Sequence, residues 1–367
     1  MNRSSPSAPH PEGYDPPPSV AAADAAAPLT PPGPAPQGVP SGLQPEERTP
    51  LRAAELIAQI RESADKLARD HTSRGDLKIL SRTLRELRYA FKVFSPYREH
   101  RKVTMFGSAR TLPDQPVYRQ AVEFGRKMAE NQWMVITGAA SGVMEAGHLG
   151  AGREHAMGLN ILLPFEQSAN RFIAGDPKLV HMKYFFTRKL MFVKESDAIC
   201  LLPGGFGTLD EGLEVLTLLQ TGKRDMIPVV LLDEPGGDYW TAFRDFFRRQ
   251  LAARGLVSPE DEYLYRLTDR VDAAIEEILG FYRVYHSMRY VHGKLVLRLN
   301  RQPDEALLRA LHAEFSDLLA TGGFQPSGPL PEEKDETALA GLPRLVFQFN
   351  RHSYGRLRQF IDRINQG

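Results

Sequence analysis

The stretch AICLLPGGFGTLDE, residues 198–211, joins an apolar run to a glycine-rich loop and to the beginning of an amphipathic segment. Its first five residues are all apolar, which is typical of a strand buried on both faces of a parallel sheet. The leucines that follow recur at helical spacing and predict a helix directly after the loop: Leu209, Leu213, Leu216 and Leu219. A strand, a glycine loop and a helix in this order indicate one unit of an α/β fold.

Four more short apolar runs lie on either side of this unit. They occupy residues 103–106, 133–136, 159–163 and 227–232, and segments with helical periodicity lie between most of them. Near-continuous apolar strands that alternate with helices are typical of a parallel sheet covered on both faces. We therefore predict a doubly wound, Rossmann-like α/β domain over residues 100–285.

The regions outside this domain differ from it in composition. Residues 1–50 hold 14 of the 28 prolines and few apolar side chains. We predict a disordered tail there, because little burial offsets the entropy of ordering. Residues 51–99 carry apolar positions at helical spacing and predict helices, whose Arg and Lys side chains we interpret as a solvated face. Residues 286–367 predict a small α+β appendage.

Two partly alternating stretches, 294–299 and 344–349, predict half-exposed strands in this appendage. A helix is expected after each of them, near 304–320 and 353–365. Between them, a polar loop rich in Gly and Pro is expected over about 321–341. The two strands are expected to form a sheet of their own or to extend the sheet of a partner.

The overall composition narrows the function classes. A formal net charge of +1 gives no overall field toward nucleic acid or a membrane surface. No apolar run approaches the roughly 20 residues of a membrane span, and the N-terminus lacks the apolar core of a secretion signal. The single cysteine, Cys200, excludes a disulfide framework and is interpreted as a small buried hydrophobe. A reducing, cytoplasmic setting fits this cysteine usage.

Three predicted strand ends carry Gly or small residues, and open parallel sheets bind ligands at the carboxyl ends of their strands. These loops are residues 106–110, 137–142 and 203–208. The third has three glycines within four positions before a helix, so its backbone N–H groups and the helix dipole favour an anion, usually phosphate. A tight structural turn is the alternative. The loop has neither the G-x-G-x-x-G nor the Walker A spacing, so dinucleotide and triphosphate chemistry are not supported.

Charged residues flank the third loop on both sides. Thr208 and Glu211 have the spacing of a capping box, with Thr208 as N-cap, and this would explain Glu211 without any catalysis. A carboxylate beside a bound phosphate also suits the sugar end of a ligand, where cationic character develops. Upstream, Arg188 and Lys189 lie where a helix is expected to begin, and cations there oppose the helix dipole. Their position indicates an anionic partner.

These residues resemble the Lonely Guy family of cytokinin-activating nucleoside monophosphate phosphoribohydrolases, which are often labelled lysine decarboxylases. Residues 203–211 match the family motif PGGxGTxxE. Arg188 and Lys189, with Met191, match the Arg-Lys motif before it, and residues 106–108 match the first-strand loop. Residues 138–144 are similar to the family's second glycine loop, although alanines replace its more usual glycines at 139 and 140. The regions outside 100–285 are similar to the longer bacterial nucleotide nucleosidases of the same superfamily.

The resemblance implies hydrolysis of the N-glycosidic bond of a nucleoside 5′-monophosphate, giving free base and ribose 5-phosphate. It implies Arg188 and Glu211 as the catalytic pair. The 5′-phosphate would be held by the third loop: Gly204, Gly205, Gly207 and Thr208. Further substrate contacts are expected from two other loops and the Arg-Lys motif: Gly107, Ser108, Gly138, Ser141, Gly142, Met144 and Lys189. Neither a metal nor an organic cofactor is implied, and family members are usually homodimers.

Three other functions compete with this interpretation. The first is a nucleotide or cofactor carrier without catalysis on the same fold, similar to molybdenum-cofactor carrier proteins. The second is an amino-acid decarboxylase, which requires pyridoxal phosphate on a lysine, and no lysine here stands out for that role. The third is a sensor whose appendage binds a regulatory nucleotide through its Arg-rich last helix. The sequence leaves open which base is preferred and whether the substrate is a cytokinin precursor.

Overall fold

The computed structural model describes residues 53–162 and 169–367, and residues 53–367 form one compact unit. The tail predicted over residues 1–50 lies outside the described residues. Among the helices that the structure describes, none combines the length and the apolar character that a bilayer crossing requires.

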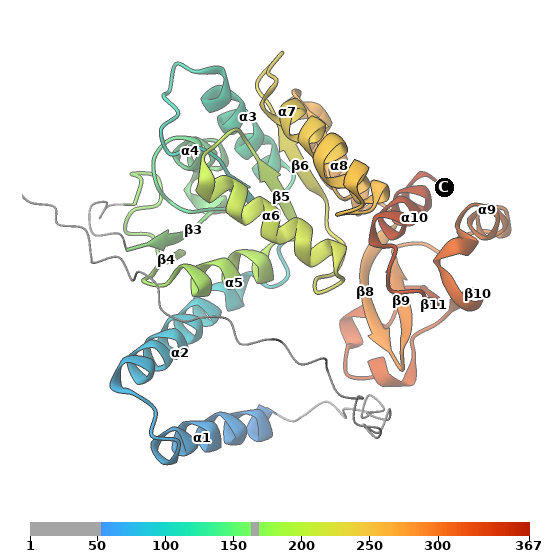
Figure 1. The fold of residues 1–367 in the computed structure, drawn as a ribbon, viewed down its shortest axis with the longest axis horizontal. Helices are drawn as coiled ribbons and strands as arrows, with labels where there is room; N and C mark the ends of the chain where they lie inside the picture. The colour runs from blue at the N-terminus through green and yellow to red at the C-terminus, as the bar shows by residue number, and fades with distance from the viewer. Residues whose placement is uncertain (1–52, 163–168) are drawn as a thin grey trace, which may run out of the picture. The chain divides into compact units, whose positions relative to one another are not determined.

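A seven-stranded parallel sheet forms the centre of the fold (Figure 1). Its strand order is β4-β3-β2-β1-β5-β6-β7, and β1 pairs with β2 on one side and with β5 on the other. The strands are β1 (Lys102–Phe106), β2 (Met134–Thr137), β3 (Ala156–Ile161), β4 (Leu179–Met182), β5 (Ala198–Leu201), β6 (Val229–Leu232) and β7 (Arg266–Thr268). This order confirms the predicted doubly wound α/β fold.

Helices cover both faces of the sheet, because successive strand side chains point to opposite sides. In β5, Cys200 packs in the core with α3 (Pro116–Glu130), α4 (Val143–His155) and α8 (Val271–Phe281). Its neighbours Ile199 and Leu201 pack in the other core with α5 (Phe185–Glu195), α6 (Phe206–Gln220) and α7 (Tyr239–Phe246). Cys200 is fully buried, as predicted, and burial raises the pKa of its thiol.

The structure corrects the predicted face of α6. Its buried positions include Gly212, Val215 and Leu219, whereas Leu213 has an exposed fraction of 47%. The leucine spacing alone therefore identified the helix but placed part of its apolar stripe on the wrong side. Two strands of this parallel sheet, β4 and β7, were not predicted, because they have only four and three residues and lack a continuous apolar run.

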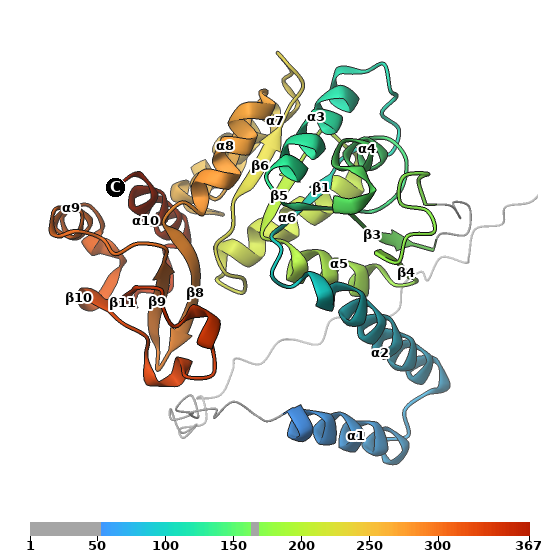
Figure 2. The ribbon, with the colours of Figure 1, turned by 180° about the vertical axis from the view of Figure 1, so that it is seen from behind.

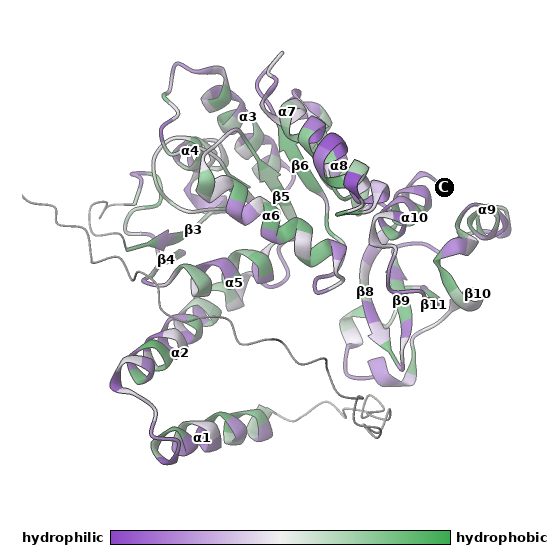
Figure 3. Cartoon of the chain, in the orientation of Figure 1, coloured by the Kyte–Doolittle hydropathy of each residue, from purple (hydrophilic) through white to green (hydrophobic). Residues whose placement is uncertain are grey.

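Two helices precede the sheet, in the region predicted to be helical. They are α1 (Ala53–Arg69) and α2 (Arg74–Phe94), and the short helix η1 (Ser95–Tyr97) follows. No residue of α1 is buried, although one stripe of it is apolar (Figure 3). In contrast, α2 buries Glu86, Ala90 and Phe94 and packs against α5 and β4. Whether a domain boundary falls at residues 99 and 285 stays a prediction.

The appendage has an antiparallel sheet of its own in the order β10-β11-β9-β8 (Figure 2). The strands are β8 (Tyr285–Val291), β9 (Lys294–Leu299), β10 (Leu319–Ser327) and β11 (Arg344–Phe349), with helices α9 (Glu305–Phe315) and α10 (Tyr354–Gln366). The prediction of a loop over 321–341 was partly wrong, since β10 extends through Ser327. Backbone pairing with β11 keeps this Gly-containing segment extended. The remaining short helices are η2 (Phe247–Leu251), η3 (Ala252–Arg254), η4 (Pro259–Leu264), η5 (Ser316–Leu318), η6 (Pro331–Glu333) and η7 (Thr337–Leu339).

The strands β9 and β11 are far more buried than predicted, because their arginines are paired inside the protein. Arg298 on β9 donates to one carboxylate oxygen of Glu333 at 2.8 Å, and Arg344 on β11 donates to the other at 3.0 Å. All three residues are at most 5% exposed. These two arginine positions therefore face a buried carboxylate and not solvent, whereas Lys294 and Gln348 are exposed.

Candidate active site

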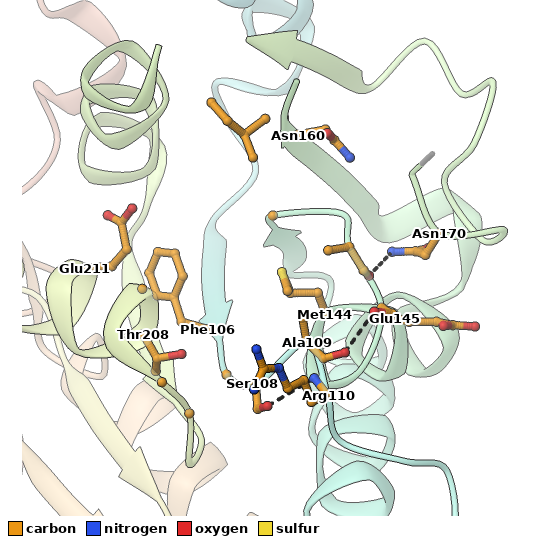
Figure 4. A pocket seen from close by; sticks show the side chains of 18 of the residues that line it. Phe106, Ser108, Ala109, Arg110, Met144, Glu145, Asn160, Asn170, Thr208 and Glu211 are labelled. Atoms are coloured by element: carbon orange, nitrogen blue, oxygen red, sulfur yellow. Dashed lines mark hydrogen bonds between the residues drawn. The ribbon is translucent and has the colours of Figure 1, made fainter. Parts of the chain in front are cut away.

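The three glycine loops follow the adjacent strands β1, β2 and β5, where the strand order reverses direction. This reversal is the place where doubly wound folds form a ligand crevice. All three loops line one cavity of about 1340 Å³ (Figure 4). In Figure 4, Thr208 and Glu211 lie on one side of the cavity, and Met144, Glu145 and Asn170 lie on the other.

Most of the predicted site residues line this cavity, although they come from four separate segments of the chain. The lining includes the proposed catalytic pair, the four phosphate-loop residues and five of the seven further substrate contacts: Arg188, Glu211, Gly204, Gly205, Gly207, Thr208, Gly107, Ser108, Gly138, Ser141 and Met144. The other two, Gly142 and Lys189, are not among the lining residues. Both contact segments that do line the cavity: Gly142 lies against the Ser108 backbone, and Lys189 pairs with α6.

The third loop leaves open space directly above its glycines. A Cβ atom added to Gly205 or Gly207 would meet no atom of the described residues within 4 Å, whereas one on Gly204 would lie 2.2 Å from the Thr208 hydroxyl. Gly205 is the N-cap of α6, so the free N–H groups of the first helical turn lie at this loop. The Tyr239 hydroxyl donates to the Gly204 carbonyl at 2.6 Å and holds the loop in place. The loop is therefore fixed on one side and open on the other, as an anion cradle requires.

We expect Gly205→Val to weaken the binding of a nucleoside monophosphate at least about tenfold, because the valine methyl groups would occupy the open space above the loop. The backbone of Gly205, with φ −86°, accepts any residue, so folding should be unaffected. Isothermal titration calorimetry with AMP measures the change. Gly328→Val is the matched control, since Gly328 also faces open space but lies in the appendage. Equal affinities for the two variants would contradict a phosphate site at this loop.

The capping box expected at Thr208 and Glu211 is absent. The helix begins two residues before Thr208, with Gly205 as N-cap and no side-chain cap bond. Glu211 is thus a residue of the second helical turn, only 5% exposed, and its carboxylate does not serve the helix end. Helix capping therefore does not account for this carboxylate in the cavity wall.

Burial raises the pKa of Glu211 to about 7, although nearby cations act in the opposite direction. Lys189 and Arg188 on α5 favour the charged form, while Asp210 and Glu214 on α6 disfavour it. The Lys189 ammonium lies 4.0 Å from the Glu211 carboxylate and forms closer ion pairs with Asp210 at 2.8 Å and Glu214 at 2.9 Å. Lys189 thus connects α5 to α6 through ion pairs.

Arg188 extends from α5 toward the second glycine loop. A Cβ atom on Gly138 would lie 3.7 Å from its Nη1 atom. Burial lowers the pKa of the Arg188 guanidinium, with Glu211 and Asp210 opposing the shift. Its Nε atom is buried and has no hydrogen-bond partner among the residues that the structure describes. Since an unpaired buried donor is costly, this guanidinium is well placed to bind a ligand acceptor.

The second glycine loop is fixed by backbone contacts that only certain residues allow. Gly142 has φ +66°, and a Cβ there would lie 2.3 Å from the Ser108 carbonyl oxygen, which accepts from the Val143 N–H at 3.0 Å. Gly142 therefore joins the first loop to the second. Ala139, which replaces a more usual glycine of the family, also has a positive φ of 58°. The alanine keeps the left-handed backbone at some cost in strain.

Several cavity residues were not identified from the sequence. They come mainly from β3, the segment after residue 168 and the flanks of the predicted motifs: Glu145, Asn160, Asn170, Arg171 and Phe185. Arg110 and Phe206 also line the cavity; they belong to the first and third predicted loops but were not proposed as site residues. The others are brought to the cavity only by tertiary contacts, such as the bond from the Asn170 amide to the Ala140 carbonyl at 3.1 Å. Within residues 53–162 and 169–367, no group of three His, Cys, Asp or Glu side chains is arranged to hold a metal ion.

The fold and the cavity define an α/β protein with a cavity lined by glycine loops at the switch point of a doubly wound sheet. Residues 137–278 match the family model described as "Possible lysine decarboxylase". The chain is also 32% identical over 180 residues to a cytokinin riboside 5′-monophosphate phosphoribohydrolase of Arabidopsis thaliana, covering 44% of this chain and 79% of that relative. The chain belongs to this Lonely Guy family.

Other relatives match over a smaller part of their length. A probable cytokinin riboside 5′-monophosphate phosphoribohydrolase of Oryza sativa subsp. japonica is 33% identical over 165 residues, which cover 43% of this chain and 64% of the relative. A second Arabidopsis thaliana enzyme of this name is 31% identical over 150 residues, covering 39% and 66%. The chain thus spans slightly less than two thirds of these two relatives.

Among solved structures, the chain is similar to the molybdenum cofactor carrier protein of Chlamydomonas reinhardtii, with 19% identity and a TM-score of 0.34 over 49% of this chain and 99% of that one. A molybdenum cofactor binding protein of Rippkaea orientalis gives 20% identity and the same TM-score, over 49% and 94%.

Proposed function

We propose that this protein hydrolyses the N-glycosidic bond of a nucleoside 5′-monophosphate, releasing the free base and ribose 5-phosphate. The observation that carries the proposal is a buried carboxylate and a guanidinium in one cavity with an open glycine loop. Burial raises the pKa of Glu211 to about 7, and the Nε atom of Arg188 has no hydrogen-bond partner within the described parts of the chain. A plain anion-binding loop requires neither residue.

Each part of the cavity then has a role in the reaction. The loop at 204–208 grips the 5′-phosphate and holds the ribose in register, which supplies binding energy remote from the bond that breaks. Cleavage of that bond builds positive charge on the ribose, as in glycoside hydrolysis. The Glu211 carboxylate stabilises this charge and orients the attacking water. Arg188 positions the nucleotide and assists the departing base with its planar set of donors.

The names of the relatives support this reaction class, since those proteins are described as phosphoribohydrolases of cytokinin riboside 5′-monophosphates. The identity of the base is a separate matter. The cavity of about 1340 Å³ exceeds the usual size of a small-molecule site, so it can admit bases that carry a substituent. We propose a purine-type monophosphate such as AMP as the substrate class, and a homodimer as the assembly.

The proposal is tested by incubating the full chain with AMP, GMP, CMP, UMP and a cytokinin riboside 5′-monophosphate. Liquid chromatography then measures the free base. We expect release from at least one monophosphate and none from the matching nucleoside without phosphate, because the loop needs the anion. Binding of a monophosphate without any base release would instead favour a carrier. Equal rates with and without the phosphate would contradict the role of the loop.

A further inference from the structure

A carboxylate from outside the matched family region contacts the helix that carries Arg188. Glu86 lies on α2 and is 5% exposed. One of its oxygens accepts from the Lys183 backbone N–H at 2.8 Å and from the Arg82 guanidinium at 2.7 Å. The other accepts from the Thr187 hydroxyl at 2.8 Å. A single side chain of α2 therefore binds the backbone and a side chain at the beginning of α5 (Figures 1 and 2).

The beginning of α5 lacks the usual sources of negative charge. Tyr184 is the N-cap and makes no side-chain cap bond, and the first turn contains no acidic residue. Two cations, Arg188 and Lys189, directly follow this first turn, and the positive end of the helix dipole disfavours them. Glu86 supplies the missing negative charge from a different helix. Burial alone would raise the pKa of Glu86, but the bonds from Arg82, Lys183 and Thr187 outweigh it and hold the pKa below its usual value.

Thr187 links this contact to the cavity. It is fully buried and directly precedes Arg188, which lines the cavity, and Lys189, which lies 4.0 Å from Glu211. A shift of the first turn of α5 would therefore move both cations relative to Glu211. Active sites tolerate such displacements poorly, because about 1 Å of misplacement can cost two orders of magnitude in rate.

We propose that Glu86 is a positioning residue that holds the first turn of α5, and with it Arg188 and Lys189, in register with Glu211. This inference rests on the proposed function. It makes α2 part of the architecture of the active site, although α2 lies outside residues 137–278, which match the family model. The alternative is that Glu86 serves only α2 through its ion pair with Arg82, four residues earlier in the same helix.

The test compares two variants at the same position, Thr187→Val and Thr187→Ser. Valine has nearly the shape of threonine but leaves the Glu86 oxygen without its donor, whereas serine keeps the hydroxyl. We expect kcat for base release to fall about tenfold in Thr187→Val, with KM changed less than twofold, and to be restored in Thr187→Ser. Glu86→Gln, which keeps the side-chain shape and removes the charge, should resemble Thr187→Val.

A second measurement reports on the helix itself and does not need turnover. Hydrogen exchange of the amides at 185–190 should be faster in Thr187→Val and Glu86→Gln than in wild type. Arg82→Leu is the matched control, since it breaks the ion pair within α2 but keeps the bonds from the Lys183 N–H, just before α5, and from Thr187 in its first turn. In this control, both kcat and the rate of hydrogen exchange at 185–190 should stay within about twofold of the wild-type values.

The pH dependence of the reaction gives a further test, because a purely structural defect would not shift it in a defined direction. Four charged groups face Glu211: Arg188 and Lys189 on α5, and Asp210 and Glu214 on α6. Displacing the two cations leaves the acids in place, so the rise of kcat with pH should move to higher pH in Thr187→Val. Equal kinetics and equal exchange in the Val and Ser variants would overturn the positioning role. If wild type releases no base from any nucleotide, the proposed function fails, and the exchange comparison still decides whether Glu86 holds α5.

Discussion

Glu211→Gln should lower kcat for base release by about a thousandfold while leaving the affinity for the monophosphate within about threefold. The amide keeps the shape of the side chain but cannot become an anion. It therefore cannot stabilise positive charge on the ribose or accept a proton from water. Binding is spared because the phosphate grip belongs to the loop at 204–208. Steady-state kinetics and calorimetry measure the two effects separately.

A matched control for this variant is Glu276→Gln, which changes an exposed carboxylate on α8, a helix on the opposite face of the sheet. It should retain wild-type kinetics. If Glu211→Gln were as active as this control, Glu211 would have no catalytic role, and base release would have to depend on other groups in the cavity.

The protonation of Glu211 makes this prediction dependent on pH. If the ionised form is the active one, wild-type kcat/KM should rise with pH through about 7, and the rise should vanish in Glu211→Gln. The same pKa affects stability. The pKa of Glu211 is higher in the folded chain than in the unfolded chain, so the folded chain binds the carboxyl proton more tightly. The stability of the fold therefore falls as pH rises toward 7. Glu211→Gln should therefore stabilise the protein by about 1–3 kcal/mol at pH 8, measured by urea unfolding.

Glu333→Gln should destabilise the protein by about 3–5 kcal/mol, the largest stability effect that we expect. The variant would leave the buried guanidinium groups of Arg298 and Arg344 without their shared carboxylate. Burial would raise the pKa of Glu333, but the Leu330 N–H and the two arginines outweigh it and lower the pKa to about 2. Urea unfolding followed by circular dichroism measures the loss.

The pH dependence of this effect has the opposite sign to that of Glu211. A lowered folded-state pKa contributes stability above the unfolded value of about 4.3, and this contribution is lost as pH falls toward 2. Glu305→Gln is the control, because Glu305 is exposed and forms an ion pair with the exposed Arg309. It should change stability by less than about 0.5 kcal/mol. A similar small change in Glu333→Gln would show that the buried ion group does not stabilise the appendage.

The sequence by itself determined the class of fold and the place of the candidate site. The apolar runs at 103–106, 133–136 and 198–202 became adjacent parallel strands, because continuous apolar character is compatible only with burial on both faces. The glycines at 204, 205 and 207 predicted the third loop, because a cluster of glycines directly after an apolar run is also a local pattern. Strand, turn and helix patterns depend on neighbours along the chain, so they can be recognised without the tertiary structure.

Only the tertiary structure decided what the charged residues do. Glu211 fitted a helix cap by its spacing, but the helix begins earlier, and the side chain is buried beside α5. Lys189 stays a predicted substrate contact, and the structure pairs it with Asp210 and Glu214, which its sequence position did not indicate. Glu86 lies about 100 residues before its partner Thr187 in the sequence. Burial and ion pairing arise from contacts between distant segments, which leave no periodic signal, and these same contacts set the pKa of the carboxylate at the site.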